Sequence, residues 1–137
     1  MKAYVDSNIF IYSMFAHHTY GKACKTIIDD LQAGSLKGVV STLVPVEVAG
    51  VAVEHDPSKA GLAVNTLYSL PLTFVEISQE VLLSASNLAS QHGLSGCDAV
   101  HVSTCLESES QVMISNDDEL KRVDEITLVK PLNYGKR

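Results

Sequence analysis

The stretch "AYVDSNIFIY" (3–12) changes from one kind of secondary structure to another at Asp6. The residues just before it, "KAYV" (2–5), form a short apolar run typical of a buried β-strand. Asp6, Ser7 and Asn8 all favour the start of a helix, and "IFIYSMFA" (9–16) continues as an apolar helix. Because a carboxylate is costly to remove from water, its position between two apolar segments needs a physical reason.

The rest of the chain repeats this alternation of strand and helix. Further strands are predicted at 37–42, 72–77, 111–116 and 126–131, and further helices at 22–32, 43–55, 56–70, 78–93, 95–109 and 117–123. We therefore predict the α/β class, as a three-layer α/β/α sandwich with a central parallel sheet of about five strands. No linker divides the chain, so residues 1–137 are expected to form one domain, with "NYGKR" (133–137) as a loose tail.

Composition narrows the possible functions. Hydrophobic residues make up 46% of the 137 and charged residues only 19%, so the chain can bury a substantial core. The net charge of -6 argues against a broad basic surface for nucleic acid, although bound cations would screen a phosphate backbone.

The cysteines and the apolar runs indicate where the protein is located. The three cysteines are odd in number and no two of them are separated by two residues, which favours a reducing cytoplasm. The strand directly after Lys2 and the short apolar runs predict neither a signal peptide nor a membrane span.

Four acidic residues occupy unusual positions. Asp6 and Asp117 follow the first and fourth predicted strands, and the carboxyl ends of parallel strands meet at one edge of a sheet. Glu47 lies within an apolar helix, with no Lys or Arg one helical turn away. Asp98 lies in the first turn of the predicted helix "SGCDAVHVSTCLESE" (95–109). Two acids are thus expected at strand ends, and two on otherwise buried helix faces.

Two interpretations of these acids stay open at this point. Asp6 and Asp117 would serve equally well as helix N-caps, and Asp98 would interact favourably with a helix dipole. If all four acids meet, however, they repel one another unless a divalent cation binds, and ligands that are all oxygen suit Mg²⁺ or Mn²⁺. His101, three residues after Asp98, is interpreted as a packed core histidine in preference to a metal ligand.

Four short motifs follow one another along the chain: "YVDSNIFIY", "STLVPVEV", "GLSGCDAVHVSTCLE" and "VMISNDDEL". In this order they resemble the motifs of the PIN domain of the VapC family of toxin ribonucleases. The resemblance covers nearly the whole chain, and the order and spacing of the motifs make it specific. It departs from the family pattern at Ser115, where Thr is usual, at Glu119, where Asp is usual, and at Leu120, where an aromatic residue is usual.

The resemblance implies a function and assigns roles to residues. The implied metal-binding catalytic acids are Asp6, Glu47, Asp98 and Asp117. Asn8 and Ser115 would orient them through hydrogen bonds, while a role for Glu119 as a fifth ligand is left open. The implied activity is Mg²⁺- or Mn²⁺-dependent cleavage of RNA that leaves a 3′-hydroxyl and a 5′-phosphate. A VapB-like antitoxin would block the acids with an inserted arginine.

The apolar character of two segments predicts a homodimer. "IFIYSMFA" (9–16) and "LVPVEVAGVAVEH" (43–55) are more apolar than helices exposed to water usually are. Two alternative functions remain at this stage. One is a PIN-like module that binds RNA or a protein without cutting, and the other is a small-molecule phosphohydrolase. The second is disfavoured because Asn8 stands where the haloacid-type enzymes need a second Asp.

Overall fold

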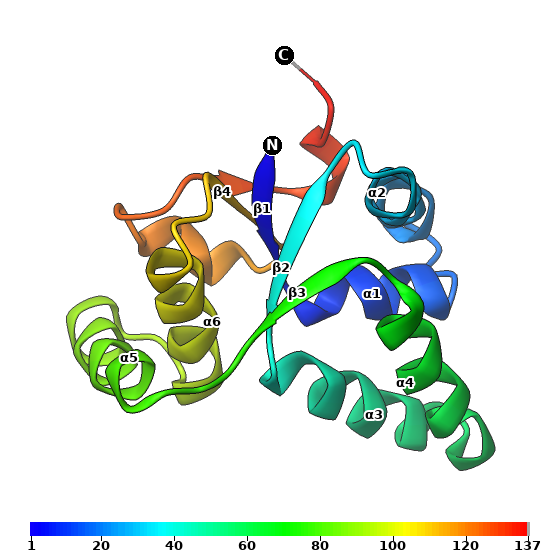
Figure 1. The fold of residues 1–137 in the computed structure, drawn as a ribbon, viewed down its shortest axis with the longest axis horizontal. Helices are drawn as coiled ribbons and strands as arrows, with labels where there is room; N and C mark the ends of the chain where they lie inside the picture. Colours follow the sequence, from blue (N-terminus) through cyan, green and yellow to red (C-terminus); the bar gives the residue numbers. More distant parts are fainter. Residues whose placement is uncertain (137) are drawn as a thin grey trace.

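The computed structural model describes residues 1–136, and a five-stranded sheet lies at its centre (Figure 1). The strands are β1 (Lys2–Val5), β2 (Lys37–Ser41), β3 (Leu72–Val75), β4 (Val112–Ile114) and β5 (Leu128–Val129). Their order across the sheet is β3-β2-β1-β4-β5, and every neighbouring pair is parallel. The predicted parallel sheet of about five strands is confirmed.

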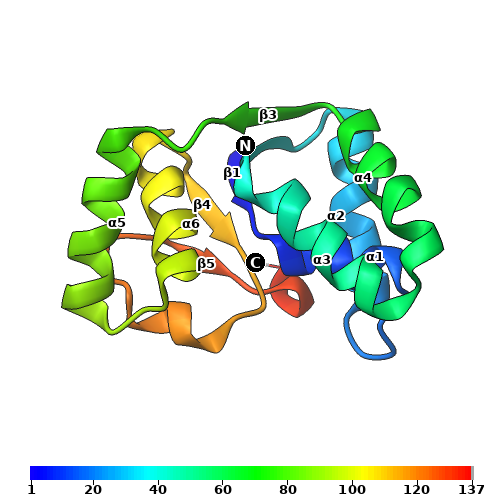
Figure 2. The same ribbon diagram turned by 90° about the horizontal axis from the view of Figure 1, so that it is seen from below.

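Helices cover both faces of the sheet. The α-helices are α1 (Ser7–Met14), α2 (Gly21–Ala33), α3 (Leu43–His55), α4 (Ala60–Ser69), α5 (Gln79–His92) and α6 (Gly96–Glu107). Short 3-10 helices are η1 (Pro57–Lys59), η2 (Asp118–Arg122) and η3 (Pro131–Asn133). Figure 2 shows α5 and α6 on one side of the strands and α1 to α4 on the other. The predicted three-layer sandwich is therefore confirmed.

Each face of the sheet has its own hydrophobic core, because side chains alternate along a strand. In β1, Ala3 and Val5 pack with α1 to α4, whereas Tyr4 packs with α5 and α6. All three are completely buried. The central strand therefore places the buried ring of Tyr4 on the face covered by α6.

The helix ends follow their local sequence. Ser78 accepts a hydrogen bond from the backbone N–H of Val81 at the start of α5, and Gly93 ends that helix in a left-handed conformation with φ 67°. Gly34 ends α2 in the same way, with φ 81°. Such glycines are favoured because they lack the Cβ atom that strains this conformation. No helix within residues 1–136 combines the length and the apolar character that a membrane crossing needs.

Three predicted elements in the last part of the chain differ from the structure. Residues 117–123 form the 3-10 helix η2 in place of an α-helix, and the strands predicted at 111–116 and 126–131 are shorter than expected. The fourth strand ends at Ile114; the backbone N–H of Ser115 still donates to the carbonyl of Val129, but the pairing stops at the next residue. The N–H of Asn116 donates to the side chain of Asn8.

The prediction of a loose tail at 133–137 is wrong for Asn133 and Tyr134, while Arg137 lies outside the residues that the structure describes. Asn133 completes η3, and the hydroxyl of Tyr134 donates a hydrogen bond to Asp30 Oδ2 at 2.7 Å. Tyr134 is half-buried and packs against the core shared with α2. The hydrogen bond between Tyr134 and Asp30 therefore attaches this segment to α2, although the polar composition of 133–137 does not predict such a contact.

We expect Tyr134→Phe to lower the free energy of unfolding by about 1 kcal/mol, because it deletes one partly buried hydrogen bond to a carboxylate. Urea unfolding followed by circular dichroism measures this difference. An unchanged unfolding midpoint would show that the tail is not held by Asp30.

Candidate functional site

Asp6 lies directly after β1, at the carboxyl edge of the sheet, and caps α1. Its Oδ1 accepts the backbone N–H of Ser7 at 2.8 Å, as the capping interpretation expects. Its Oδ2 accepts the hydroxyl of Ser115 at 2.7 Å. The Asp6 side chain is only 6% exposed. Asp6 therefore serves as a helix cap and also points one oxygen toward the end of β4.

Ser115 and Asn8 connect the ends of β1 and β4. The hydroxyl of Ser115 donates to Asp6 and accepts the backbone N–H of Asp117 and the amide of Asn8, both at 3.2 Å. Asn8 Oδ1 in turn accepts the backbone N–H of Asn116 at 3.2 Å. The two residues named for an orienting role thus contact Asp6 and the backbone of Asp117 directly.

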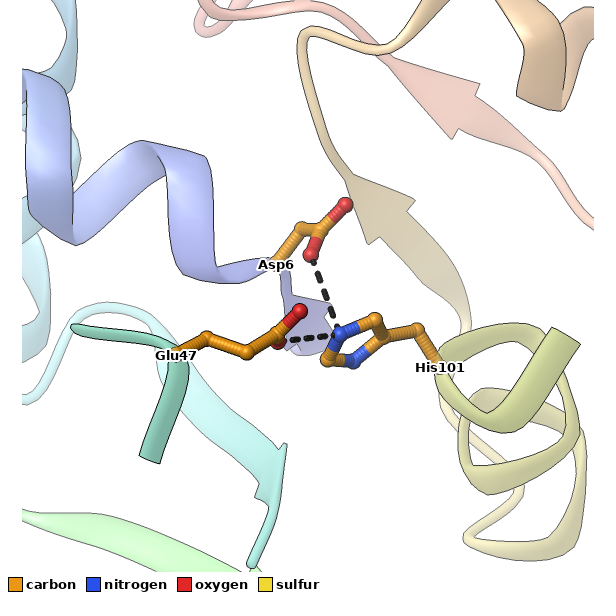
Figure 3. A group of neighbouring side chains, drawn as sticks. All are labelled: Asp6, Glu47 and His101. Carbon is orange, nitrogen blue, oxygen red and sulfur yellow. Dashed lines mark hydrogen bonds and ion pairs between the residues drawn. The ribbon is translucent and has the colours of Figure 1, made fainter. Parts of the chain in front are cut away.

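Asp6, Glu47 and His101 form one group of potential metal ligands (Figure 3). They come from the end of β1, from α3 and from α6, and one ligand atom of each lies within 4.8 Å of the others. Glu47 Oε1 is 2.6 Å from His101 Nε2, and Asp6 Oδ1 is 3.7 Å from the same nitrogen. Helices on opposite faces of the sheet therefore bring their polar groups together at its edge.

Asp98, Asp117 and Glu119 form a second group, again with ligand atoms within 4.8 Å of one another. Asp98 lies in the first turn of α6, and its backbone N–H donates to the capping hydroxyl of Ser95 at 3.2 Å. Asp117 caps η2 by accepting the N–H of Glu119 at 2.9 Å. The capping interpretation of Asp117 is therefore confirmed, and the same carboxylate faces Asp98.

The charges of these acids are poorly compensated. Burial and, after it, the negative charges of Asp117 and Asp6 together raise the pKa of Asp98 from 3.8 to about 6. Burial lowers the pKa of His101, but the hydrogen bond to Glu47 and the charge of Asp6 outweigh it, so the pKa is raised overall. Within residues 1–136, the only basic side chain within 4.0 Å of any of the four acids is His101.

The nearby lysines and arginine pair with other acids. Lys121 and Lys130 both contact Asp118, which is largely exposed, and their charges and hydrogen bonds lower the pKa of that carboxyl group. Arg122 lies 3.8 Å from Glu119. The chain therefore neutralises Asp118, while the adjacent Asp117 is left facing Asp98.

A divalent cation fits this donor set. The four predicted acids come together in two groups, which are joined by Asp6, Ser115 and the backbone of Asp117. Carboxylate oxygens are the preferred ligands of hard cations such as Mg²⁺ and Mn²⁺. Burial and, after it, the charges of Asp117 and Asp6 raise the pKa of Asp98, and a bound cation would offset both effects. Glu119 is placed to contribute, but its side chain is 55% exposed and already pairs with Arg122.

Sequence reasoning missed the contacts of His101. The residue is buried, as its interpretation as a core histidine expects, yet it also touches Glu47 and Asp6. The burial agrees with the prediction of a packed histidine, but that prediction did not include these two polar contacts. One signal was available, since Asp98 lies three residues earlier and residues at this spacing share a helix face. The second partner of His101, Tyr4, is 97 residues away and no local pattern predicts it.

Comparisons with known proteins agree with the geometry. Residues 3–126 match the family model of the PIN domain. A chain of the VapBC2 complex of Rickettsia felis, solved bound to a DNA fragment from its promoter, superposes with a TM-score of 0.74 at 18% identity; the match covers 95% of this chain and 98% of that one. Curated proteins gave no significant match.

Two further solved structures share the fold. Mycobacterium tuberculosis VapC20, described as a toxin that cleaves the sarcin-ricin loop, has a TM-score of 0.75 at 13% identity, over 89% of this chain and 95% of that one. VapBC-1 from nontypeable Haemophilus influenzae has a TM-score of 0.71 at 17% identity, over 96% and 99%. The predicted resemblance is confirmed: this chain belongs to the PIN domain family.

Proposed function

We propose that residues 1–137 act as one nuclease domain, a Mg²⁺- or Mn²⁺-dependent endoribonuclease that is the toxin of a VapBC-type pair. The observation that carries the proposal is the meeting of four carboxylates at the carboxyl edge of the sheet without a lysine or arginine partner in the described chain. The catalytic and metal-binding acids in this proposal are Asp6, Glu47, Asp98 and Asp117. Such a toxin acts in the cytoplasm, where its RNA substrate is found.

Different residues of the chain have different roles in the proposed reaction. The carboxylates would hold the cation, which when bound supplies an activated water and stabilises the phosphate oxygens. Ser115 and Asn8 hold Asp6 in one orientation through hydrogen bonds of 2.7 and 3.5 Å to its Oδ2. Asp98 holds a proton more tightly than an ordinary aspartate, and it would release that proton when the cation binds.

Exposed apolar side chains support a protein partner. Val46 and Val53 on α3 and Leu62 and Tyr68 on α4 are between 49% and 67% exposed. Large apolar groups on neighbouring helices are typical of interaction surfaces. We propose that they serve homodimer formation and antitoxin binding, as the VapBC complexes among the structural neighbours suggest. Light scattering on the purified protein measures the oligomeric state.

The test of the function is incubation of the purified protein with single-stranded RNA in Mn²⁺, in Mg²⁺ and in EDTA. We expect cleavage that requires the metal and produces 5′-phosphate ends, because the attacking water adds to the phosphorus and the leaving oxygen departs as the 3′-hydroxyl. Tight RNA binding with no products in either metal would favour the silent RNA-binding module. Hydrolysis of a small phosphate ester but not of RNA would favour the phosphohydrolase.

A further inference from the structure

Tyr4 lies behind the candidate metal site and is completely buried on the α6 side of the sheet. Its hydroxyl oxygen accepts the backbone N–H of Ser41, at the end of β2, at 3.2 Å. The same hydroxyl is 2.6 Å from His101 Nδ1. One phenol therefore connects the ends of two strands to the imidazole that touches Glu47 and Asp6.

These contacts determine where the protons lie. A tyrosine phenol ordinarily keeps its proton near neutral pH, and the hydroxyl of Tyr4 lies buried between a backbone N–H and a ring nitrogen. Among the residues that the structure describes, its oxygen has two partners: the N–H of Ser41 donates to it, and Nδ1 of His101 is the one acceptor for its own proton. A neutral imidazole that accepts at Nδ1 carries its hydrogen on Nε2.

The nitrogen that carries this hydrogen is the one that faces the acids. His101 Nε2 is 2.6 Å from Glu47 Oε1 and 3.7 Å from Asp6 Oδ1. A protonated ring nitrogen has no lone pair for a metal ion. His101 lies where a metal ligand could stand, but the hydrogen on Nε2 makes it a hydrogen-bond donor.

We propose that Tyr4 and His101 are positioning residues, with Tyr4 fixing the imidazole so that its Nε2–H donates to Glu47 and does not bind the cation. This inference rests on the proposed function, because it assigns Glu47 to the metal site. The Glu47 side chain is 28% exposed and belongs to an apolar helix, and within residues 1–136 no lysine or arginine lies within 4.0 Å of it. His101 therefore supplies the contact that selects one orientation of a flexible carboxylate.

The first test reads the tautomer directly in the wild-type protein. Histidine labelled with ¹⁵N in both ring nitrogens distinguishes Nδ1–H from Nε2–H by chemical shift and by one-bond coupling to hydrogen. The spectra are recorded without metal, at a pH above the titration of the imidazole, and again with saturating Mg²⁺. We expect a protonated Nε2 in both states. A protonated Nδ1, or an Nε2 that loses its hydrogen when Mg²⁺ is added, would overturn the proposal.

The second test separates positioning from general stability. Tyr4→Phe is expected to lower kcat for RNA about 10- to 100-fold with little change in KM, the range seen when groups behind a metal ligand are removed. Tyr134→Phe is the matched control, because it also deletes one tyrosine hydrogen bond to a polar partner but lies on the α2 side. Equal losses in the two variants would contradict a positioning role for Tyr4.

His101 gives an independent variant pair. Gln offers an amide N–H where Nε2 stands, whereas Leu fills the space with no donor. We expect His101→Gln to keep at least about a tenth of the activity and His101→Leu to lose about 100-fold. Mn²⁺ affinity, measured by calorimetry, is expected to fall more in His101→Leu than in His101→Gln. The reverse order in either measurement would refute the donor assignment.

The readouts distinguish this inference from the proposed function. If the protein binds Mn²⁺ and shows the expected tautomer but cuts no RNA, the ribonuclease proposal fails and the assignment of Tyr4 and His101 stands. If RNA is cleaved with metal but Nε2 is unprotonated, the ribonuclease proposal stands and the positioning proposal fails.

Discussion

Asp6→Asn is expected to reduce metal-dependent RNA cleavage by at least about 1000-fold. The substitution removes a negative charge that would bind the proposed cation, at a position buried from water. Asp6 is the acid that links the two groups. It lies beside His101 Nε2 at 3.7 Å, accepts the hydroxyl of Ser115, and its charge raises the pKa of Asp98. Asparagine keeps the size of the side chain but replaces one acceptor oxygen with an amide donor. The measurement is the initial rate of RNA cleavage at saturating Mn²⁺, with Mn²⁺ affinity measured in parallel.

The matched control for this variant is Asp118→Asn. Asp118 lies one residue beyond Asp117, is largely exposed, and already pairs with Lys121 and Lys130. We expect its substitution to change the rate less than about twofold, since surface ion pairs contribute little. Circular dichroism verifies that both variants are folded. An Asp6→Asn protein that keeps more than a tenth of the wild-type rate would remove Asp6 from the catalytic acids.

The position of three of the four acids follows from rules of the fold that sequence can reveal. Asp6 and Asp117 come after apolar runs, and parallel strands bring their ends to one edge. Glu47 has no basic residue within a helical turn, so its partner had to come from elsewhere in the fold. Periodicity and local composition are enough to predict these positions, because the longer helices and strands form where their local sequence favours them.

The remaining features depend on contacts between residues far apart in sequence. The donor role of His101 needs Tyr4 and Ser41 at particular distances, and no spacing rule encodes the direction of a hydrogen bond. The apolar helix at 9–16 was interpreted as a partner surface, yet Ile9 and Phe10 are completely buried within the chain itself. Apolar composition predicts burial but does not identify what covers the helix, so the exposed Val46 and Leu62 are the better guide.

Without a divalent cation, the protein is expected to lose stability as the pH rises from about 4 to about 7. Burial, followed by the charges of Asp117 and Asp6, raises the pKa of Asp98 from 3.8 to about 6 in the folded chain, while the unfolded chain keeps the ordinary value. A raised pKa means that the folded state binds this proton more tightly. The contribution of Asp98 to the free energy of unfolding is therefore complete below its pKa in the unfolded chain. It is lost as the pH rises through its pKa in the folded chain. A shift of this size corresponds to about 1–3 kcal/mol.

Urea unfolding in EDTA across this pH range measures the effect, as the difference between wild type and Asp98→Asn at each pH. Asparagine cannot ionise, so the variant is expected to lack the part of the fall that belongs to Asp98. Asp118→Asn is the control of opposite sign, because Lys130 and Lys121 lower the pKa of that carboxyl group. A difference between wild type and Asp98→Asn that stays constant with pH would show that Asp98 does not meet uncompensated charge.

Adding Mg²⁺ is expected to reverse this pH dependence, because a cation takes the place of the proton between the acids. The ion binds the folded state and stabilises it by mass action, and it competes with protons at Asp98. The gain in unfolding free energy from Mg²⁺ should therefore be small near pH 5 and largest above the folded pKa of about 6. In Asp98→Asn the gain should be smaller at every pH and should no longer rise through that value. A gain in wild type that is independent of pH would place the cation away from Asp98.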